Sequence, residues 1–143
     1  MDHIVFPDSG ARELENLISG SKSMILRGSD EKCVPYGMVS EGDMIYFADP
    51  EAGGLIKAKG RVTFVFNSGK LTCEESFETI IRHQDRLQLP DNLFYSIAGK
   101  RYLVIIGLDP VTEIHPVPVR DALSYNEGDW IVAGDAAVVG ALS

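Results

Sequence analysis

The clearest pattern in the chain is a strict alternation over residues 55–66. Small and apolar residues, ending in Phe64 and Phe66, fill the even positions, while Lys57, Lys59 and Arg61 fill odd ones. A period of two predicts a half-buried strand of an antiparallel sheet, with the even residues on the inner face.

Other apolar runs predict more strands. Residues 101–108 are nearly all apolar, which is typical of a central strand with both faces covered. Shorter runs predict strands at residues 3–6, 23–27, 44–48, 111–119 and 128–132. Proline cannot donate to a sheet ladder, so Pro7, Pro116 and Pro118 predict that the first and fourth of these shorter strands are edge strands.

Two segments have the spacing of helices. Leu14, Leu17 and Ile18 form a narrow apolar stripe that predicts a helix over about 10–19, with Ser9 as its N-cap and Gly20 just after its end.

The second helix is predicted over about 73–87. Thr72 and Glu75 have the spacing of a capping box at its start. Pro90 lies beyond its end, and a short turn of helix is expected at 91–96.

These elements predict an α+β fold, a small and mostly antiparallel β-barrel of five to seven strands with two flanking helices. The 143 residues, 45% of them hydrophobic, are enough for one domain with a real core. Residues 120–143 form a C-terminal extension whose structure the pattern does not define beyond the strand at 128–132. No apolar run reaches the roughly 18 residues of a membrane span, and residues 1–20 lack the features of a signal peptide. We therefore expect a cytoplasmic protein with no membrane partner.

The net charge of −8 argues against a protein that coats nucleic acid by bulk charge. The excess is uneven, because residues 102–143 contain six acidic groups and Arg120 alone as a basic one. A local basic surface in the first part of the chain is therefore still expected. Cys33 and Cys73 fit no zinc spacing and are expected to be free thiols, and the sequence predicts no metal or cofactor.

Several short segments together resemble the ASCH domains of the PUA-like superfamily. The run from Ile18 to Arg27, with Gly20 and Lys22, is similar to the family's helix end, Gly-x-Lys and strand closing in Arg. The other matching segments follow in the expected order: Gly42-Asp43 before a hydrophobic strand, the Gly53-Gly54 turn, Tyr102 to Leu108, and Ile114 to Pro116. The resemblance covers about residues 1–119.

The resemblance implies a pseudo-barrel of five or six strands that binds RNA or a modified nucleotide. A few members hydrolyse the acyl group of acetylated cytidine nucleosides. Those enzymes share Lys22 but have a Thr where this chain has Ile25, and other members have Glu there. Isoleucine supplies neither a nucleophile nor a proton carrier, so we expect a binding domain rather than an enzyme.

The candidate ligand-binding residues form two groups. Lys22 and Arg27, with the Ser23 hydroxyl, are expected to fix phosphate or a base edge in one cleft, and Tyr36 is the best candidate to stack a base. Tyr46, Tyr95, Tyr102 and Trp130 are further stacking candidates. The row Lys57, Lys59 and Arg61, with neighbours roughly 6.6 Å apart, is expected to follow an RNA backbone.

Each assignment has an alternative. Lys22 and Arg27 are equally consistent with solvated or ion-paired side chains, and the basic row with an ordinary solvent-facing strand. Asp43 is expected to be a turn residue. At the level of function, the alternatives are a small amidohydrolase of acylated nucleosides and a non-catalytic protein-interaction module, the latter favoured by the acidic charge.

Overall fold

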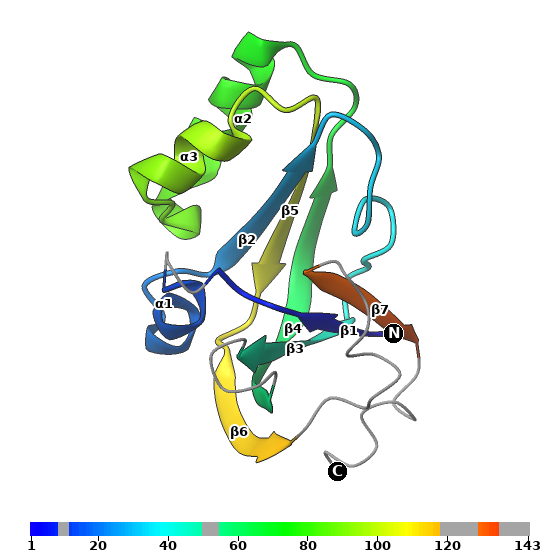
Figure 1. The fold of residues 1–143 in the computed structure, drawn as a ribbon, viewed down its shortest axis with the longest axis vertical. Coiled ribbons are helices and arrows are strands. Elements are labelled where there is room, and N and C mark those ends of the chain that lie inside the picture. Colours follow the sequence, from blue (N-terminus) through cyan, green and yellow to red (C-terminus); the bar gives the residue numbers. More distant parts are fainter. Residues whose placement is uncertain (9–11, 50–54, 118–128, 135–143) are drawn as a thin grey trace.

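A curled, mostly antiparallel sheet with helices packed against it makes up the described part of the molecule (Figure 1). The computed structural model describes residues 1–8, 12–49, 55–117 and 129–134. Its strands are β1 (Asp2–Val5), β2 (Met24–Ser29), β3 (Met44–Asp49), β4 (Leu55–Asn67), β5 (Tyr102–Leu108), β6 (Thr112–Val117) and β7 (Trp130–Gly134). Its helices are α1 (Glu13–Ser19), α2 (Cys73–Leu87) and α3 (Asp91–Ile97).

The strands are ordered β2-β5-β4-β3-β1-β7, and β6 also pairs with β4. Only the pair β1–β3 is parallel among the pairs described. The 13-residue β4 is the central strand of the sheet and pairs with three others. Strand β3 lies along one edge of β4, while β5 and β6 pair with different parts of its other edge. The predicted α+β half-barrel and the central position of β5 are therefore confirmed.

One expectation about the elements was wrong. The strand before Pro7 is not an edge strand, because β7 pairs with β1 on the side away from β3. The turn of helix expected at 91–96 is confirmed as a helix of seven residues, which gives three helices among the described residues. The long separation in sequence between β1 and β7 explains why local pattern could not show their pairing.

The inner face of β4 changes halfway along the strand. The register of the β4–β5 pair shifts between Val62 and Phe64. As a result, Val62 and Val65 pack in one hydrophobic cluster, while Phe64 and Phe66 pack against another. A bulge inserts one residue and so reverses which alternate residues face inward. The strict alternation expected over 55–66 therefore holds only up to the bulge.

The hydrophobic side chains form three clusters. The largest fills the concave side of the sheet around Phe47, and a second lies between β2, β5 and the helices α2 and α3 around Ile80. A small third cluster contains one buried side chain from each of β1, β3, β4 and β7. The helices α2 and α3 pack on β2, and α3 and β2 together form one wall of the cleft described below.

The helix ends follow the sequence closely. Thr72 and Glu75 make both hydrogen bonds of the predicted capping box. Gly20 ends α1 with a φ of 85°, a left-handed conformation that glycine adopts at little cost. The Ser9 cap, the Gly53-Gly54 turn and most of the C-terminal extension lie outside the described residues. Among the described helices, none is long and apolar enough to cross a membrane.

Candidate functional site

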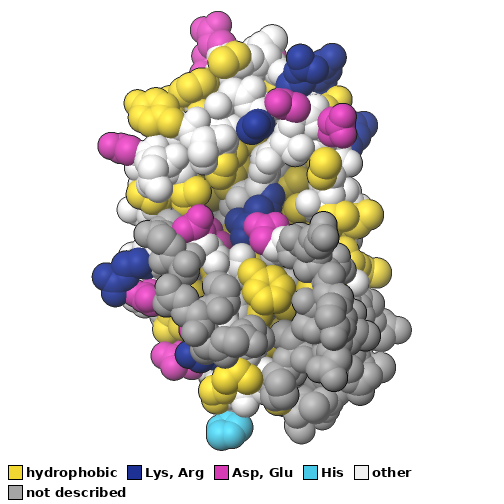
Figure 2. All heavy atoms as spheres, viewed as in Figure 1, with side chains coloured by type: hydrophobic (Ala, Val, Ile, Leu, Met, Phe, Trp, Pro, Cys, Tyr) yellow, Lys and Arg dark blue, Asp and Glu magenta, His cyan; other side chains and the backbone are white. Residues whose placement is uncertain are grey.

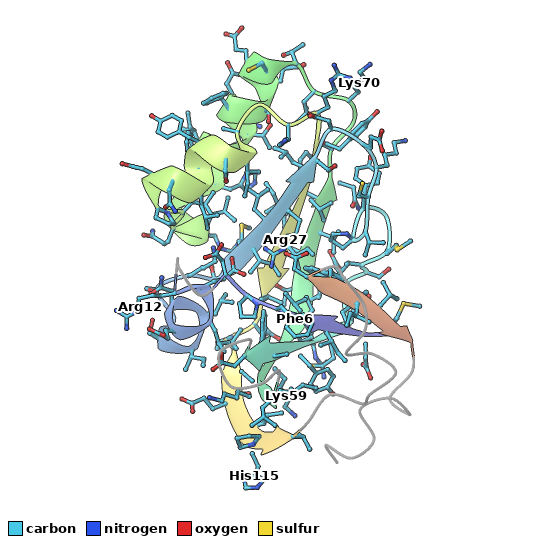
Figure 3. The ribbon with its side chains drawn as sticks, viewed as in Figure 1. Phe6, Arg12, Arg27, Lys59, Lys70 and His115 are labelled. Carbon is cyan, nitrogen blue, oxygen red and sulfur yellow. The ribbon has the colours of Figure 1, made fainter. Side chains whose placement is uncertain are left out.

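A cleft of about 450 Å³ opens beside β2, the end strand of the sheet order. Its polar lining comes from Asp8, Glu13, Arg27 and Asp129. Its apolar lining comes from β2, from α3 and the residues before it, and from the segment after β1: Leu26, Leu89, Leu93, Ile97 and Phe6. Figure 2 shows this hollow across the middle of the molecule, with basic atoms between acidic ones, at the place where Figure 3 labels Arg27.

Arg27 is the central side chain of this cleft. Its Nη2 donates a hydrogen bond of 3.3 Å to Oε1 of Glu13, and its Nη1 donates one of 2.8 Å to the Leu26 carbonyl oxygen. Its Nε lies 2.9 Å from Oδ2 of Asp129 in an ion pair. Each guanidinium nitrogen thus has an oxygen of the protein as its neighbour.

The surroundings keep Arg27 charged. Burial disfavours the guanidinium cation, but the carboxylates of Glu13 and Asp129 outweigh it and raise the pKa of Arg27 above its ordinary value. The Trp130 ring centroid lies 5.8 Å from Cζ of Arg27, a distance at which the aromatic face attracts a cation. Arg27 is therefore held in place from several sides.

Glu13 is the residue that joins the two predicted basic side chains. Its side chain is only 3% exposed, and Oε2 lies 3.9 Å from Nζ of Lys22. From the sequence alone, Glu13 is one residue of the helix predicted over about 10–19. The signal that could have identified it is its position four residues before Leu17, which places both on the buried face of α1.

Lys22 is buried rather than directed at a ligand. Its side chain is 3% exposed, and its Nζ donates a hydrogen bond to the Leu87 carbonyl oxygen at the end of α2. Burial lowers the pKa of Lys22 to about 8, an effect that Arg27 strengthens and Glu13 opposes. Lys22 and Arg27 do converge, as the prediction required, but they meet at Glu13, and Lys22 is not among the described residues that line the cleft.

Ser23 and Tyr36 make contacts within the protein. The Ser23 hydroxyl accepts a hydrogen bond of 2.9 Å from Nε of Arg86, which ties β2 to α2. The Tyr36 hydroxyl donates to the Ser68 carbonyl oxygen, and its ring packs edge-on against Tyr102. Tyr36 borders a recess of about 30 Å³, which is closer in size to a water site than to a nucleobase site.

The basic row is present on β4. Lys59 and Arg61 are exposed, and half-buried Lys57 pairs with Asp49 at 3.1 Å. Lys57 also lines a second cavity, of about 280 Å³, which shares Glu13 with the cleft. In Figure 3, Lys59 lies in the lower half of the molecule and Arg27 near its centre, so Lys59 lies apart from the cleft.

Buried side chains next to Arg27 form a row of hydrogen bonds that no sequence pattern indicated. Asp43 Oδ2 lies 2.9 Å from Nε2 of His3 and accepts a hydrogen bond of 2.9 Å from the Ser40 backbone N–H. On the other side of the His3 ring, Trp130 Nε1 donates to Nδ1 at 3.2 Å. Asp43 is thus more than the turn residue expected from Gly42-Asp43.

The aromatic candidates differ in accessibility. Trp130 is 4% exposed and its ring contacts His3, so it is not available for stacking a base. Tyr46 and Tyr102 are half-buried, and Tyr95 is exposed on α3. Phe6, which was not a candidate, is the aromatic side chain among the described residues that line the cleft.

The position of Ile25 bears on the catalytic alternative. Ile25 is fully buried in the largest hydrophobic cluster, so this position offers no reactive group to the cleft. No group of three or more His, Cys, Asp or Glu side chains in the described part of the chain could hold a metal ion. Both cysteines are free and exposed.

Comparisons with known proteins identify the fold. No family model matches the sequence, and no curated protein sequence matches it. The ASCH protein of Zymomonas mobilis has a similar crystal structure, with a TM-score of 0.68 and 10% identity over 99% of this chain and 94% of that one. Two single-substitution variants of that protein each give a TM-score of 0.71 at 10% identity, over 99% of this chain and 99% or 96% of theirs. Likeness at this identity shows the fold alone, which is that of the Zymomonas mobilis ASCH protein.

Proposed function

From the ASCH fold and the cleft at Arg27, we propose that this protein binds RNA or a nucleotide by taking a base into that cleft. One observation carries the proposal: Arg27 lies charged and fixed at the centre of a cleft of about 450 Å³ whose walls combine apolar side chains with three carboxylates. Small-molecule sites combine an apolar lining with a few fixed polar groups in this way.

The chemistry of a nucleobase suits these walls. The flat faces of a base gain from contact with apolar and aromatic side chains, here Phe6, Leu93 and Ile97. The edge of the base carries hydrogen-bonding groups, which require fixed polar partners such as Arg27. In this proposal Lys22 acts indirectly, by holding Glu13 beside Arg27.

The basic row of β4 is proposed as a second contact with RNA. Lys57, Lys59 and Arg61 follow one another along one face of the strand at roughly 6.6 Å intervals. Positive side chains at this spacing can follow a phosphate backbone whose base enters the cleft.

The test is a binding titration of single-stranded RNA and of nucleosides, at low and at physiological salt. The parent, Arg27→Ala and Lys22→Ala are compared with Arg82→Ala, a matched loss of an exposed arginine on α2. We expect dissociation constants on the order of micromolar for the parent and the control, and loss of binding in Arg27→Ala. Equal binding by the parent and a folded Arg27→Ala variant would contradict the proposal.

One observation keeps the amidohydrolase as a second candidate. The Lys22 amine lies 3.9 Å from the Glu13 carboxylate and has a pKa lowered to about 8, and an amine with a pKa near neutral suits general acid–base catalysis. Release of acetate from N4-acetylcytidine by the parent, and its loss in Lys22→Met, would establish this activity. Absence of turnover, with binding present, would leave the binding function alone.

A further inference from the structure

The cleft offers a ligand more hydrogen-bond acceptors than donors. A guanidinium has five N–H donors and no acceptor. All three nitrogens of Arg27 already face protein oxygens, from Glu13, Leu26 and Asp129. One N–H of each Nη is hydrogen-bonded within the protein, and Nε is buried beside Asp129 without a hydrogen bond, so the second N–H of each Nη remains for a ligand.

Acceptors, in contrast, are plentiful. A carboxylate accepts only, with about four lone-pair sites on its two oxygens. Glu13 and Asp129 each direct one oxygen at Arg27. The Asp129 side chain is 57% exposed and can reach a ligand, whereas that of Glu13 is 3% exposed and serves to hold Arg27.

The same arrangement disfavours phosphate. Two positive charges, on Arg27 and on Lys22 beside Glu13, stand against three carboxylates in the lining, those of Glu13, Asp129 and Asp8. A phosphate placed here would face these negative charges at short range, where like charges repel strongly. An uncharged ligand rich in N–H donors fits the cleft better than an anion does.

We propose, resting on the base-binding function above, that the cleft selects guanine and that Asp129 is the residue that determines this choice. The Watson–Crick edge of guanine carries a ring N–H and an amino group side by side, with one carbonyl acceptor. Cytosine and uracil each offer one donor position and two acceptors there, and adenine one of each. An acceptor-rich site with few free donors therefore matches guanine.

Each part of guanine has a partner in this assignment. The ring N–H and the amino group donate to the exposed Asp129 carboxylate, and a remaining N–H of Arg27 donates to the guanine carbonyl. Charge-assisted hydrogen bonds to a carboxylate are about twice as strong as neutral ones. The apolar side chains Leu93 and Ile97 cover a face of the ring.

The experiment measures the affinities of guanosine, inosine, cytidine, adenosine and uridine by calorimetry, for the parent and Asp129→Asn. Glu113→Gln is the matched control, since Glu113 is exposed on β6 and outside the lining of the cleft. We expect the parent and the control to bind guanosine at least about tenfold more tightly than inosine, which lacks the amino group, and than cytidine. In Asp129→Asn this preference should shrink to about twofold or less.

A second arm tests the exclusion of phosphate. Guanosine 5′-monophosphate should bind no more tightly than guanosine, inorganic phosphate should not compete, and salt should have little effect. Equal affinity for all bases, a preference for cytidine, a preference that survives Asp129→Asn, or competition by phosphate would each overturn the guanine assignment. In those cases RNA binding that depends on Arg27 would still uphold the proposed function, whereas no binding of any RNA or nucleoside would remove both.

Discussion

The indole N–H of Trp130 donates a hydrogen bond of 3.2 Å to Nδ1 of His3, 127 residues away in the sequence. An indole nitrogen only donates, so Nδ1 must be the unprotonated nitrogen of the ring. Nε2 then bears the proton and donates to Asp43 Oδ2 at 2.9 Å. This buried chain ties β7 to β1 and so fixes Asp129, the residue before Trp130, against Arg27.

Replacing Trp130 with Phe should destabilise the protein by about 1–3 kcal/mol, because Nδ1 of the buried His3 loses its donor and the smaller ring leaves space behind. Urea denaturation measures the change. Tyr95→Phe, at an exposed ring on α3, is the control and should leave the midpoint unchanged. A Trp130→Phe variant as stable as the parent would show that this hydrogen bond contributes nothing.

The Asp43 carboxylate should stabilise the fold at neutral pH and lose that effect in acid. Burial raises its pKa, but the hydrogen bonds from His3, the Ser40 N–H and the Met1 amino group outweigh burial and lower it. Because the unfolded chain takes up the proton first, stability falls as the pH drops through the lowered pKa of the folded state. Asp43→Asn should cost about 1–3 kcal/mol at neutral pH and show a shallower loss on acidification. Parallel urea midpoints for both proteins across the acid range would contradict this.

The buried Lys22 should make the protein more stable in alkali. Its pKa is lowered from 10.5 to about 8, so between these values the unfolded chain holds a proton that the folded one does not. Stability should therefore rise with pH over this window, by up to about 3 kcal/mol. Since other groups also titrate there, the measurement is the difference between the parent and Lys22→Met in urea midpoints at each pH. A difference that does not change with pH would show that Lys22 keeps its ordinary pKa.

Reversing the charge of Lys59 should weaken RNA binding and flatten its salt dependence. Each phosphate contact to a single strand adds about 0.7 to the slope of log affinity against log salt, so Lys59→Glu should lower the slope by about that amount or more. Lys70→Glu is the matched control, because Lys70 lies at the opposite end of the molecule from Lys59 (Figure 3). An unchanged slope in Lys59→Glu would remove the basic row from the proposed interface.

Local patterns predicted most of the elements because their causes are local. The alternation along β4, the capping box of Thr72 and Glu75, and the left-handed Gly20 each depend on residues close in sequence. The same patterns placed Arg27 on a strand and allowed it to meet Lys22 only if the chain turned before that strand. They indicated that Glu13 lies on the same helix face as Leu17, but not that its carboxylate joins Lys22 to Arg27, because that contact depends on how α1 packs.

What the sequence alone determined about this protein is therefore the class of fold, the alternation that sets the basic row of β4, and the candidacy of Arg27. The tertiary structure decided the rest. Pairing of β7 with β1 brought Asp129 and Trp130 to Arg27, and packing of α1 and α2 buried Lys22 and Glu13 together. Ionic and hydrogen-bonded partners far apart in the chain leave no periodic signal, since their proximity depends on how complete elements pack.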